Sequence, residues 1–186
     1  MFFRKLLLST LVLSNFIYAQ SSIGINVNSD DVELSANYNL SSHYEGAIDY
    51  QADLSYLYNS NKNNLISFGI NGEAALESAP GLIFGFGFEA VYTDDFMAIP
   101  LLGKVRYILP FDSDIPTTSL LISYSYAPSG LTFSDGESYS NLKMEANMEV
   151  IPSVDIFTGY RNIDTDYKYI DYELNDSFYG GLKFSF

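Results

Sequence analysis

The sequence predicts an all-β protein: a single transmembrane, antiparallel, up-and-down β-barrel of about ten strands, with eight as the alternative. Segments in which apolar and polar residues alternate recur from residue 23 to the last residue, and a period of two is typical of strands. Most of these segments run to roughly ten residues, which is about the length that crosses a bilayer when tilted. Their apolar faces carry no charged residue, as contact with lipid requires.

Residues 1–19 are predicted to form a signal peptide, which leaves residues 20–186 as the barrel domain. Arg4 and Lys5 precede an apolar stretch from Leu6 to Tyr18, and Ala19 offers a small residue for cleavage. The alternative is a transmembrane anchor. This apolar stretch contains Ser and Asn and is shorter than the about 20 residues that a spanning helix needs.

Charge and cysteine content exclude several classes of function. The chain carries 9 basic and 23 acidic residues, and loss of Arg4 and Lys5 with the signal peptide leaves a net charge of −16. Binding to nucleic acid needs a basic surface, so no nucleic-acid partner is expected. The chain contains no cysteine, and we therefore expect neither disulfides nor thiol chemistry.

Ten segments are predicted as strands, separated by residues that favour turns. In chain order they cover residues 23–27, 31–38, 47–56, 65–75, 81–90, 99–107, 119–126, 141–150, 154–161 and 177–186. An even number of strands places both termini on the periplasmic side. The two longest connections, 127–138 and 163–176, are therefore expected as extracellular loops.

Alternation alone does not distinguish a soluble sandwich or lipocalin-like barrel from an outer-membrane barrel, because the two bury opposite faces. Tyrosines near the strand ends, such as Tyr56, Tyr107 and Tyr126, favour the membrane, where they suit the headgroup girdles. The C-terminal segment resembles the signal by which bacterial outer-membrane barrels are recognised for assembly. That signal lies in Tyr179, Gly181, Leu182, Phe184 and Phe186.

The second half of the chain resembles the YfaZ family of bacterial outer-membrane proteins over residues 119–186. The features that carry this resemblance are a Tyr-rich strand ending on a small residue and Pro, and a later Gly-Tyr-Arg. Here these are Tyr124, Tyr126, Ala127 and Pro128, then Gly159, Tyr160 and Arg161. Asn162 departs from the pattern, since the family usually has another aromatic there. The resemblance implies a Gram-negative outer membrane, with its lipid, lipopolysaccharide and barrel-assembly machinery as partners, and a small porin-like barrel without a catalytic motif.

Charged residues on the polar faces are expected to point into the lumen. The acids are Glu33, Asp49, Asp53, Glu73, Glu89, Glu145, Glu149 and Asp155, and the bases are Lys104, Arg106, Lys143, Arg161 and Lys183. Buried charges must pair with each other or meet water. Two interpretations follow: an ion-pair network that plugs a narrow lumen, or a thin, acid-lined, cation-preferring pore.

No enzyme activity, cofactor or metal is expected. His43 is the sole histidine, and parity places it on the periplasmic side, away from the rim where small barrel enzymes hold their sites. Five carboxylates in 163–176 could collect Ca²⁺ or Mg²⁺, but their spacing fits no EF-hand; they are Asp164, Asp166, Asp171, Glu173 and Asp176. The expected function is a small porin-like pore, with a non-conducting structural or surface-interaction barrel as the alternative.

Overall fold

A computed structural model describes residues 21–41, 48–60, 62–94, 96–111, 116–168 and 170–186. The predicted signal peptide and His43 lie outside these residues. The strands are β1 (Ser22–Val27), β2 (Asp31–Asn39), β3 (Asp49–Asn59), β4 (Leu65–Ala75), β5 (Leu82–Thr93), β6 (Phe96–Ala98), β7 (Leu101–Ile108), β8 (Thr118–Ala127), β9 (Thr132–Ser134), β10 (Gly136–Ile151), β11 (Val154–Tyr167) and β12 (Ile170–Ser185). A single turn of 3₁₀ helix, η2 (Ser129–Leu131), is the helical element of this part of the chain. No helix of the described residues is long and apolar enough to cross a membrane.

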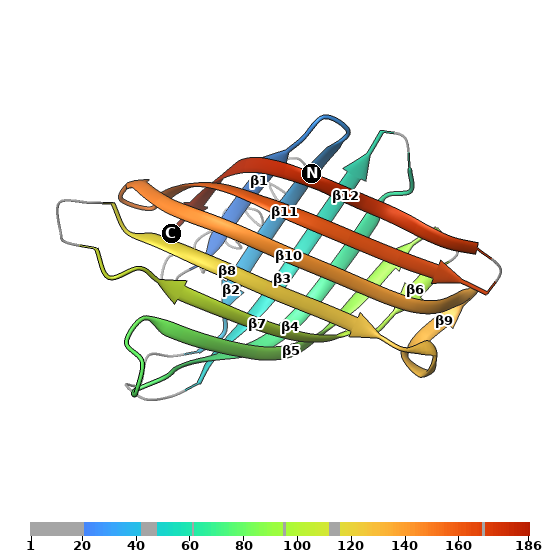
Figure 1. Ribbon diagram of the computed structural model, residues 1–186, viewed down its shortest axis with the longest axis horizontal. Coiled ribbons are helices and arrows are strands. Elements are labelled where there is room, and N and C mark those ends of the chain that lie inside the picture. Colours follow the sequence, from blue (N-terminus) through green and yellow to red (C-terminus); the bar gives the residue numbers. More distant parts are fainter. Residues whose placement is uncertain (1–20, 42–47, 61, 95, 112–115, 169) are drawn as a thin grey trace, which may run out of the picture.

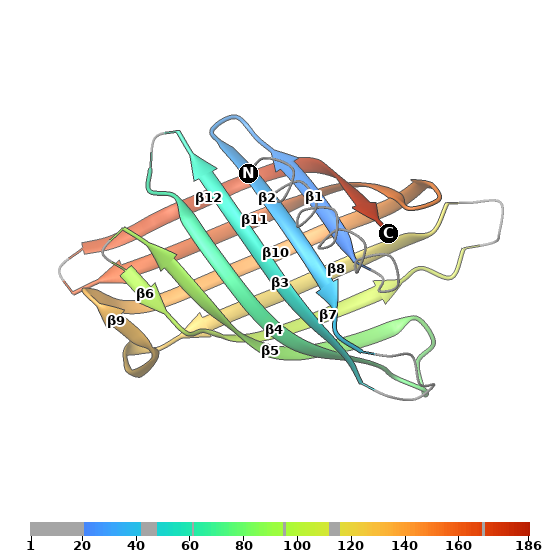
Figure 2. The ribbon, with the colours of Figure 1, turned by 180° about the vertical axis from the view of Figure 1, so that it is seen from behind.

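Ten of the strands close into an antiparallel barrel. Their order around the ring is β1-β2-β3-β4-β5-β7-β8-β10-β11-β12, and β12 pairs back with β1. The wall of β8 and β10–β12 faces the viewer in Figure 1 and the wall of β2–β4 in Figure 2, and the strands of the two walls cross at a steep angle. Such tilt is what closure of a sheet requires. The prediction of a ten-stranded all-β barrel is confirmed, and the eight-stranded alternative is wrong.

The two remaining strands, β6 and β9, pair with each other outside the ring of ten. β6 pairs with the end of β5, and Ile99 and Pro100 separate it from β7. η2 likewise separates β9 from β8. Proline cannot donate to a ladder, which explains the interruption between β6 and β7. The two short strands thereby extend the wall at one end of the barrel.

The predicted loop over 163–176 is wrong. These residues belong mostly to β11 and β12, which stay paired up to Tyr167 and Ile170. A bulge lies where Ile163 pairs with Asn175 and Asp164 pairs with Glu173, with Leu174 as the extra residue. The expected loop 127–138 is also partly strand, because it contains β9 and the start of β10. The acidic residues of this region therefore stand on a long hairpin rather than on a loop.

Large apolar side chains cover the outside of the barrel. Phe86 and Phe178 are 73% and 77% exposed, and they alternate with inward residues on β5 and β12. The other eight strands of the ring also carry outward, exposed apolar residues; representative ones are Ile25, Leu34, Leu54, Phe68, Leu101, Ile122, Met144 and Ile156. Met97 is the outward residue of β6. A face of this kind is buried only by lipid, so the barrel is of the transmembrane type.

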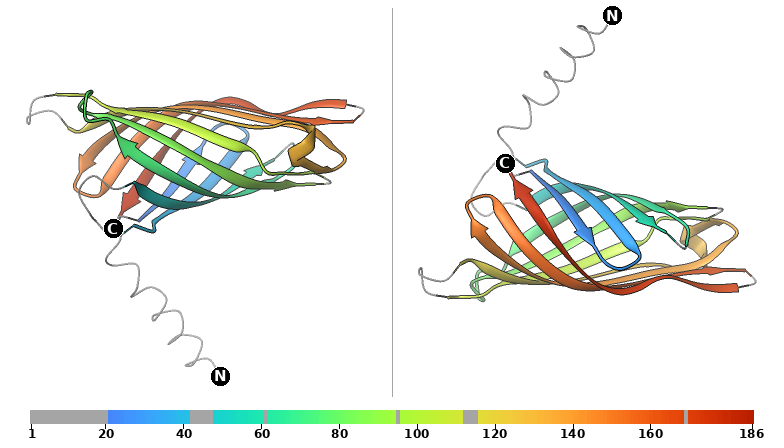
Figure 3. Two further views of the ribbon diagram at one scale, coloured as in Figure 1. Left: turned by 90° about the horizontal axis from the view of Figure 1, so that it is seen from below. Right: turned by 90° about the horizontal axis from the view of Figure 1, so that it is seen from above.

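β1 and β12 form the seam that closes the barrel (Figure 3). Ser22 pairs with Ser185, and beyond β12 the backbones of Ser21 and Phe186 exchange two hydrogen bonds of 3.0 and 2.8 Å. Phe184 and Phe186 lie on the outer face and are each 48% exposed. The last residues of the chain are thus part of the ladder, where closure leaves no unpaired edge in lipid.

Candidate functional site

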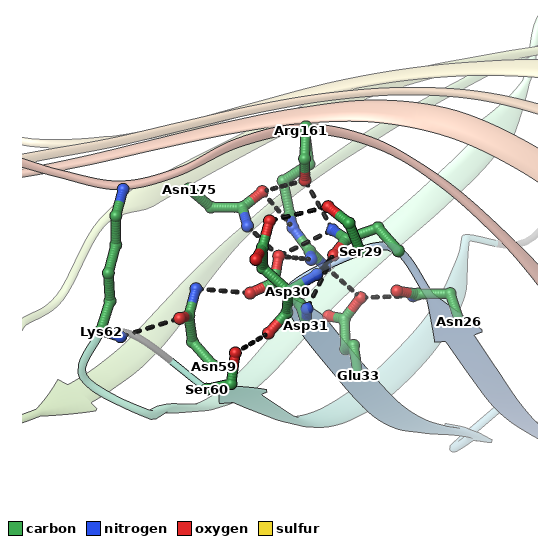
Figure 4. Close-up of polar contacts among 12 residues, drawn as sticks. Asn26, Ser29, Asp30, Asp31, Glu33, Asn59, Ser60, Lys62, Arg161 and Asn175 are labelled. Atoms are coloured by element: carbon green, nitrogen blue, oxygen red, sulfur yellow. Dashed lines mark hydrogen bonds and ion pairs between the residues drawn. The ribbon is translucent and has the colours of Figure 1, made fainter.

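Arg161 reaches from β11 into a group of polar side chains inside the barrel (Figure 4). β11 turns this side chain inward, and only 1% of it is exposed. Its Nη1 donates to Glu33 Oε2 at 2.6 Å, and its Nη2 lies 3.7 Å from Asp31 Oδ2. Its Nε donates to Asn175 Oδ1 at 3.2 Å. Because Asp31 and Glu33 belong to β2, these contacts join strands that are not neighbours in the ring.

Amide side chains complete the hydrogen bonding of the two acids. Asn26 donates to Glu33 Oε2 at 2.6 Å, and both Asn59 and Asn175 donate to Asp31. All of these side chains are buried. A buried charge is tolerated when it has both an opposite charge and hydrogen-bond donors, and here each carboxylate has both.

A second group of contacts surrounds Tyr179 on β12. Lys143 Nζ lies 3.8 Å from Glu33 Oε2 and 3.7 Å from Glu145 Oε2. The Tyr179 hydroxyl donates to Glu145 Oε2 at 3.0 Å, and Lys183 Nζ lies 3.6 Å from Glu145 Oε1. The Arg161 guanidinium and the Lys143 ammonium lie 5.2 and 5.5 Å from the centre of the Tyr179 ring, within cation–π range. Lys143 links this group to the one around Arg161.

Where an inward-facing residue is glycine, the side chains of its register partners on the two flanking strands can meet over it. We call the glycine and these two partners a glycine row. In the row Glu145–Gly159–Tyr179 a Cβ on Gly159 would lie 2.6 Å from the Tyr179 hydroxyl oxygen. In the row Glu73–Gly85–Lys104 a Cβ on Gly85 would lie 2.6 Å from Lys104 Cγ. Each row joins an acid to a donor, since Lys104 forms an ion pair with Glu73. Arg106 Nη2 adds a contact to Glu73 at 3.7 Å.

An apolar cluster occupies the lumen at the end that carries the β1–β2 and β11–β12 turns. Its buried members come from β3, β4, β5, β6, β8, β10, β11 and β12: Leu57, Leu65, Val91, Phe96, Ala98, Ala127, Tyr139, Ile163 and Leu174. Phe96 is central, with ring centres 6.2 Å from Tyr139 and 5.4 Å from Tyr167. Residues from opposite walls meet in one packed cluster, so this end of the lumen is filled with apolar side chains.

The structure places the predicted lumen charges as follows. Glu33, Glu73, Glu145 and Arg161 are buried, whereas Asp53, Glu89, Lys104, Arg106, Lys143, Glu149, Asp155 and Lys183 are partly buried and Asp49 is exposed. Glu149 accepts a hydrogen bond from the Ser153 backbone at 3.3 Å and stays at the β10–β11 turn, away from Arg161. In the predicted assembly signal, Tyr179 faces inward and is 3% exposed, while Leu182 faces outward.

Sequence reasoning missed part of the network and all of the apolar cluster. Asp31 begins the predicted strand 31–38 but is absent from the predicted lumen charges, and the amides Asn26, Asn59 and Asn175 carry no charge that would mark them. Strand parity is the signal that could have found Asp31, because Asp31 has the same inward parity as Glu33 on β2.

The described residues hold no group of three or more acidic, histidine or cysteine side chains placed to bind a metal ion. On the acidic hairpin, Asp166 accepts a hydrogen bond from Ser138, and Asp164 pairs in register with Glu173. The carboxylates predicted as a divalent-ion collector are thus spread along two strands.

Comparison with protein families gives a match for the second half of the chain. Residues 98–186 match the family described as YfaZ precursor. This confirms the resemblance inferred from the sequence. All five predicted lumen bases, from Lys104 to Lys183, lie within the YfaZ-matching region, whereas Asp31, Glu33, Asp53, Glu73 and Glu89 lie before it. The ion pairs of Arg161 and Lys104 therefore connect the YfaZ-matching region to the preceding half of the barrel.

Two solved structures are similar in fold. A chain of a structure described as "Unveiling the Mechanism Behind the in-meso Crystallization of Membrane Proteins" is 11% identical with a TM-score of 0.49, and the match covers 91% of this chain and 83% of that one. A chain described as "Bacterial polysaccharide outer membrane secretin" is 13% identical with a TM-score of 0.47, covering 89% of this chain and 68% of that one. Comparison with curated proteins found no significant match.

Proposed function

We propose that the protein is a small barrel of the Gram-negative outer membrane that is closed to hydrophilic solutes and acts as a structural or surface-interaction barrel. The apolar cluster is the observation that carries this proposal. Phe96 and Ala98 on β6 and Leu174 on β12 are each at most 1% exposed. A water column through this end would have to displace packed apolar side chains, which costs their burial free energy.

The polar network adds a second barrier next to the apolar cluster. Arg161 and Glu33 are held to each other and to amides from β1 and β12. An ion that passed through would have to break charge-assisted hydrogen bonds, each stronger than a neutral one. The interior of a ten-stranded barrel is only slightly wider than that of an eight-stranded barrel, which side chains fill.

Planar-bilayer recording of the refolded protein tests the proposal. We expect a silent bilayer from protein whose folded state is verified by its heat-modifiable mobility in gels. Stable conductance steps under the same conditions would contradict a closed barrel.

A narrow, cation-preferring pore is the second candidate. The predicted lumen charges number eight acids and five bases, and such an excess attracts cations. Phe96 and Ala98 of the apolar cluster lie on β6, outside the ring of ten, so a displacement of β6 would remove them from the lumen. On this hypothesis conductance steps are cation-selective and change in Glu89→Gln or Arg106→Ala.

We further propose that the seam strand carries the assembly signal. Replacing Phe184 and Phe186 with Ser removes two outward aromatics that are each 48% exposed to the lipid side and weakens a recognition strand rich in alternating apolar residues. We expect the double variant to be exported but not inserted, with the protein absent from the outer-membrane fraction. Normal amounts of the heat-modifiable form in that fraction would contradict the proposal. Phe111→Ser, which alters an exposed aromatic outside the strands, is the control.

An outer-membrane location agrees with the outward apolar face and with the YfaZ match. The description of that family as a precursor accords with the signal peptide predicted for residues 1–19. Lipid, lipopolysaccharide and the barrel-assembly machinery are the partners that this location implies.

A further inference from the structure

A third glycine row in the lumen lacks the match of acid and donor found in the other two. Asp53 on β3 pairs in register with Gly69 on β4, and Gly69 pairs with Glu89 on β5. The two residues that flank this glycine are therefore both carboxylates. In the row Glu73–Gly85–Lys104 the third position holds a base, and the row closes with an ion pair.

Side-chain carbons of both acids border Gly69. A Cβ on this glycine would lie 3.2 Å from Glu89 Cγ and 3.8 Å from Asp53 Cβ. Both acids are partly buried. Within the described part of the chain, no lysine or arginine forms an ion pair with either of them. Asn37 Nδ2 donates to Asp53 Oδ1 at 2.7 Å, but a hydrogen bond from a neutral amide does not cancel the charge of a carboxylate, and two carboxylates beside one glycine favour a cation.

A buried amide next to this pair has an unused oxygen. Asn71 on β4 is 2% exposed, and its Nδ2 donates to Asp53 Oδ2. Its Oδ1 has no hydrogen-bond partner among the described residues. Leaving a buried acceptor unpaired is costly, and this one belongs to an amide that lies against the Asp53 carboxylate. On the other side, the Ser125 hydroxyl donates to Glu89 Oε2 at 3.0 Å.

We propose that Asp53 and Glu89 bind a divalent cation, with Ca²⁺ as the probe ion, above Gly69. Asn71 Oδ1 is the third protein ligand, the Ser125 hydroxyl lies at the edge of the site, and water completes the coordination. Carboxylate and amide oxygens are the ligands that Ca²⁺ takes, and two carboxylates neutralise its charge. The site does not depend on either candidate function, because a cation can bind in the lumen whether or not the lumen conducts ions.

Calorimetric titration of CaCl₂ into the refolded, mature chain in detergent micelles tests the site. We expect saturable binding and a higher melting temperature with Ca²⁺. Asp53→Asn and Glu89→Gln should each weaken the affinity at least about tenfold, since each removes one of two charged ligands. Gly69→Ala should also weaken it, because its Cβ would press on Glu89. The matched control is Glu149→Gln, which neutralises another partly buried carboxylate and should bind as the unaltered chain does.

Two results would overturn the proposal. The first is no binding and no Ca²⁺-dependent shift of the melting temperature. The second is binding that survives in Asp53→Asn, Glu89→Gln and Gly69→Ala alike, which would place the ion elsewhere, such as on the acidic hairpin. Gel mobility establishes that each variant is folded before it is titrated.

Discussion

Replacing Arg161 with Met is expected to lower the free energy of unfolding by about 3–5 kcal/mol, the cost of removing one partner from a buried ion pair. The guanidinium binds Glu33 at 2.6 Å and also contacts Asp31 and Asn175. Met keeps an unbranched apolar stem but carries no charge, so Asp31 and Glu33 would stay buried without their main cation. Urea titration of protein refolded in lipid vesicles, followed by gel mobility and circular dichroism, measures the change.

A surface ion pair and a second substitution serve as controls. Lys62 Nζ lies 3.9 Å from a Glu173 oxygen, and the two side chains are 33% and 55% exposed. Lys62→Met should therefore cost no more than about 1 kcal/mol. Adding Glu33→Gln to Arg161→Met should restore part of the lost stability, because the unpaired carboxylate is removed. Equal, small effects of Arg161→Met and Lys62→Met would contradict the central place of Arg161.

The strands and their faces could be predicted because period-two alternation determines both at once. All ten predicted segments are wall strands. The hairpin over 163–176 was missed because its acidic residues resemble a loop. At Ile163 and Thr165, which are 2% and 0% exposed, the inward alternation of β11 continues beyond the predicted strand end.

The faces of the lumen charges could be predicted, but their partners could not. Alternation shows that Arg161 and Glu33 both point inward. It does not show at which height each lies, since height depends on the tilt and stagger of strands far apart in sequence. The contact between β11 and β2 therefore required the structure.

The apolar cluster was missed because the lumen was expected to be polar throughout. Leu57, Val91 and Ile163 have inward parity, and each lies near the end of its strand. Since alternate strands run in opposite directions, these three ends fall at the same end of the barrel. Apolar residues of inward parity that gather at one end are thus a signal that the sequence contains.

The second large effect concerns access of water to the apolar cluster. The chain has no cysteine, so a single introduced thiol can be labelled selectively. Ala98 is 0% exposed and lies in the apolar cluster, whereas Asp155, near the β10–β11 turn at the other end, is partly exposed. We expect Ala98→Cys to react with a membrane-impermeant maleimide on the order of 100-fold more slowly than Asp155→Cys, because reaction requires local opening. Adding Phe96→Ser should abolish most of this protection.

The most direct measurement of a closed lumen is this ratio of labelling rates in nanodiscs, where the reagent reaches both ends of the barrel. Ile122→Cys, on the lipid-facing side of β8, provides the rate for a thiol covered by lipid. A closed lumen predicts that Ala98→Cys is as slow as Ile122→Cys and that Asp155→Cys is fast. Labelling of Ala98→Cys at the rate of Asp155→Cys, in protein with intact Arg161 and Phe96, would show a water-filled path through the barrel and contradict the closed lumen.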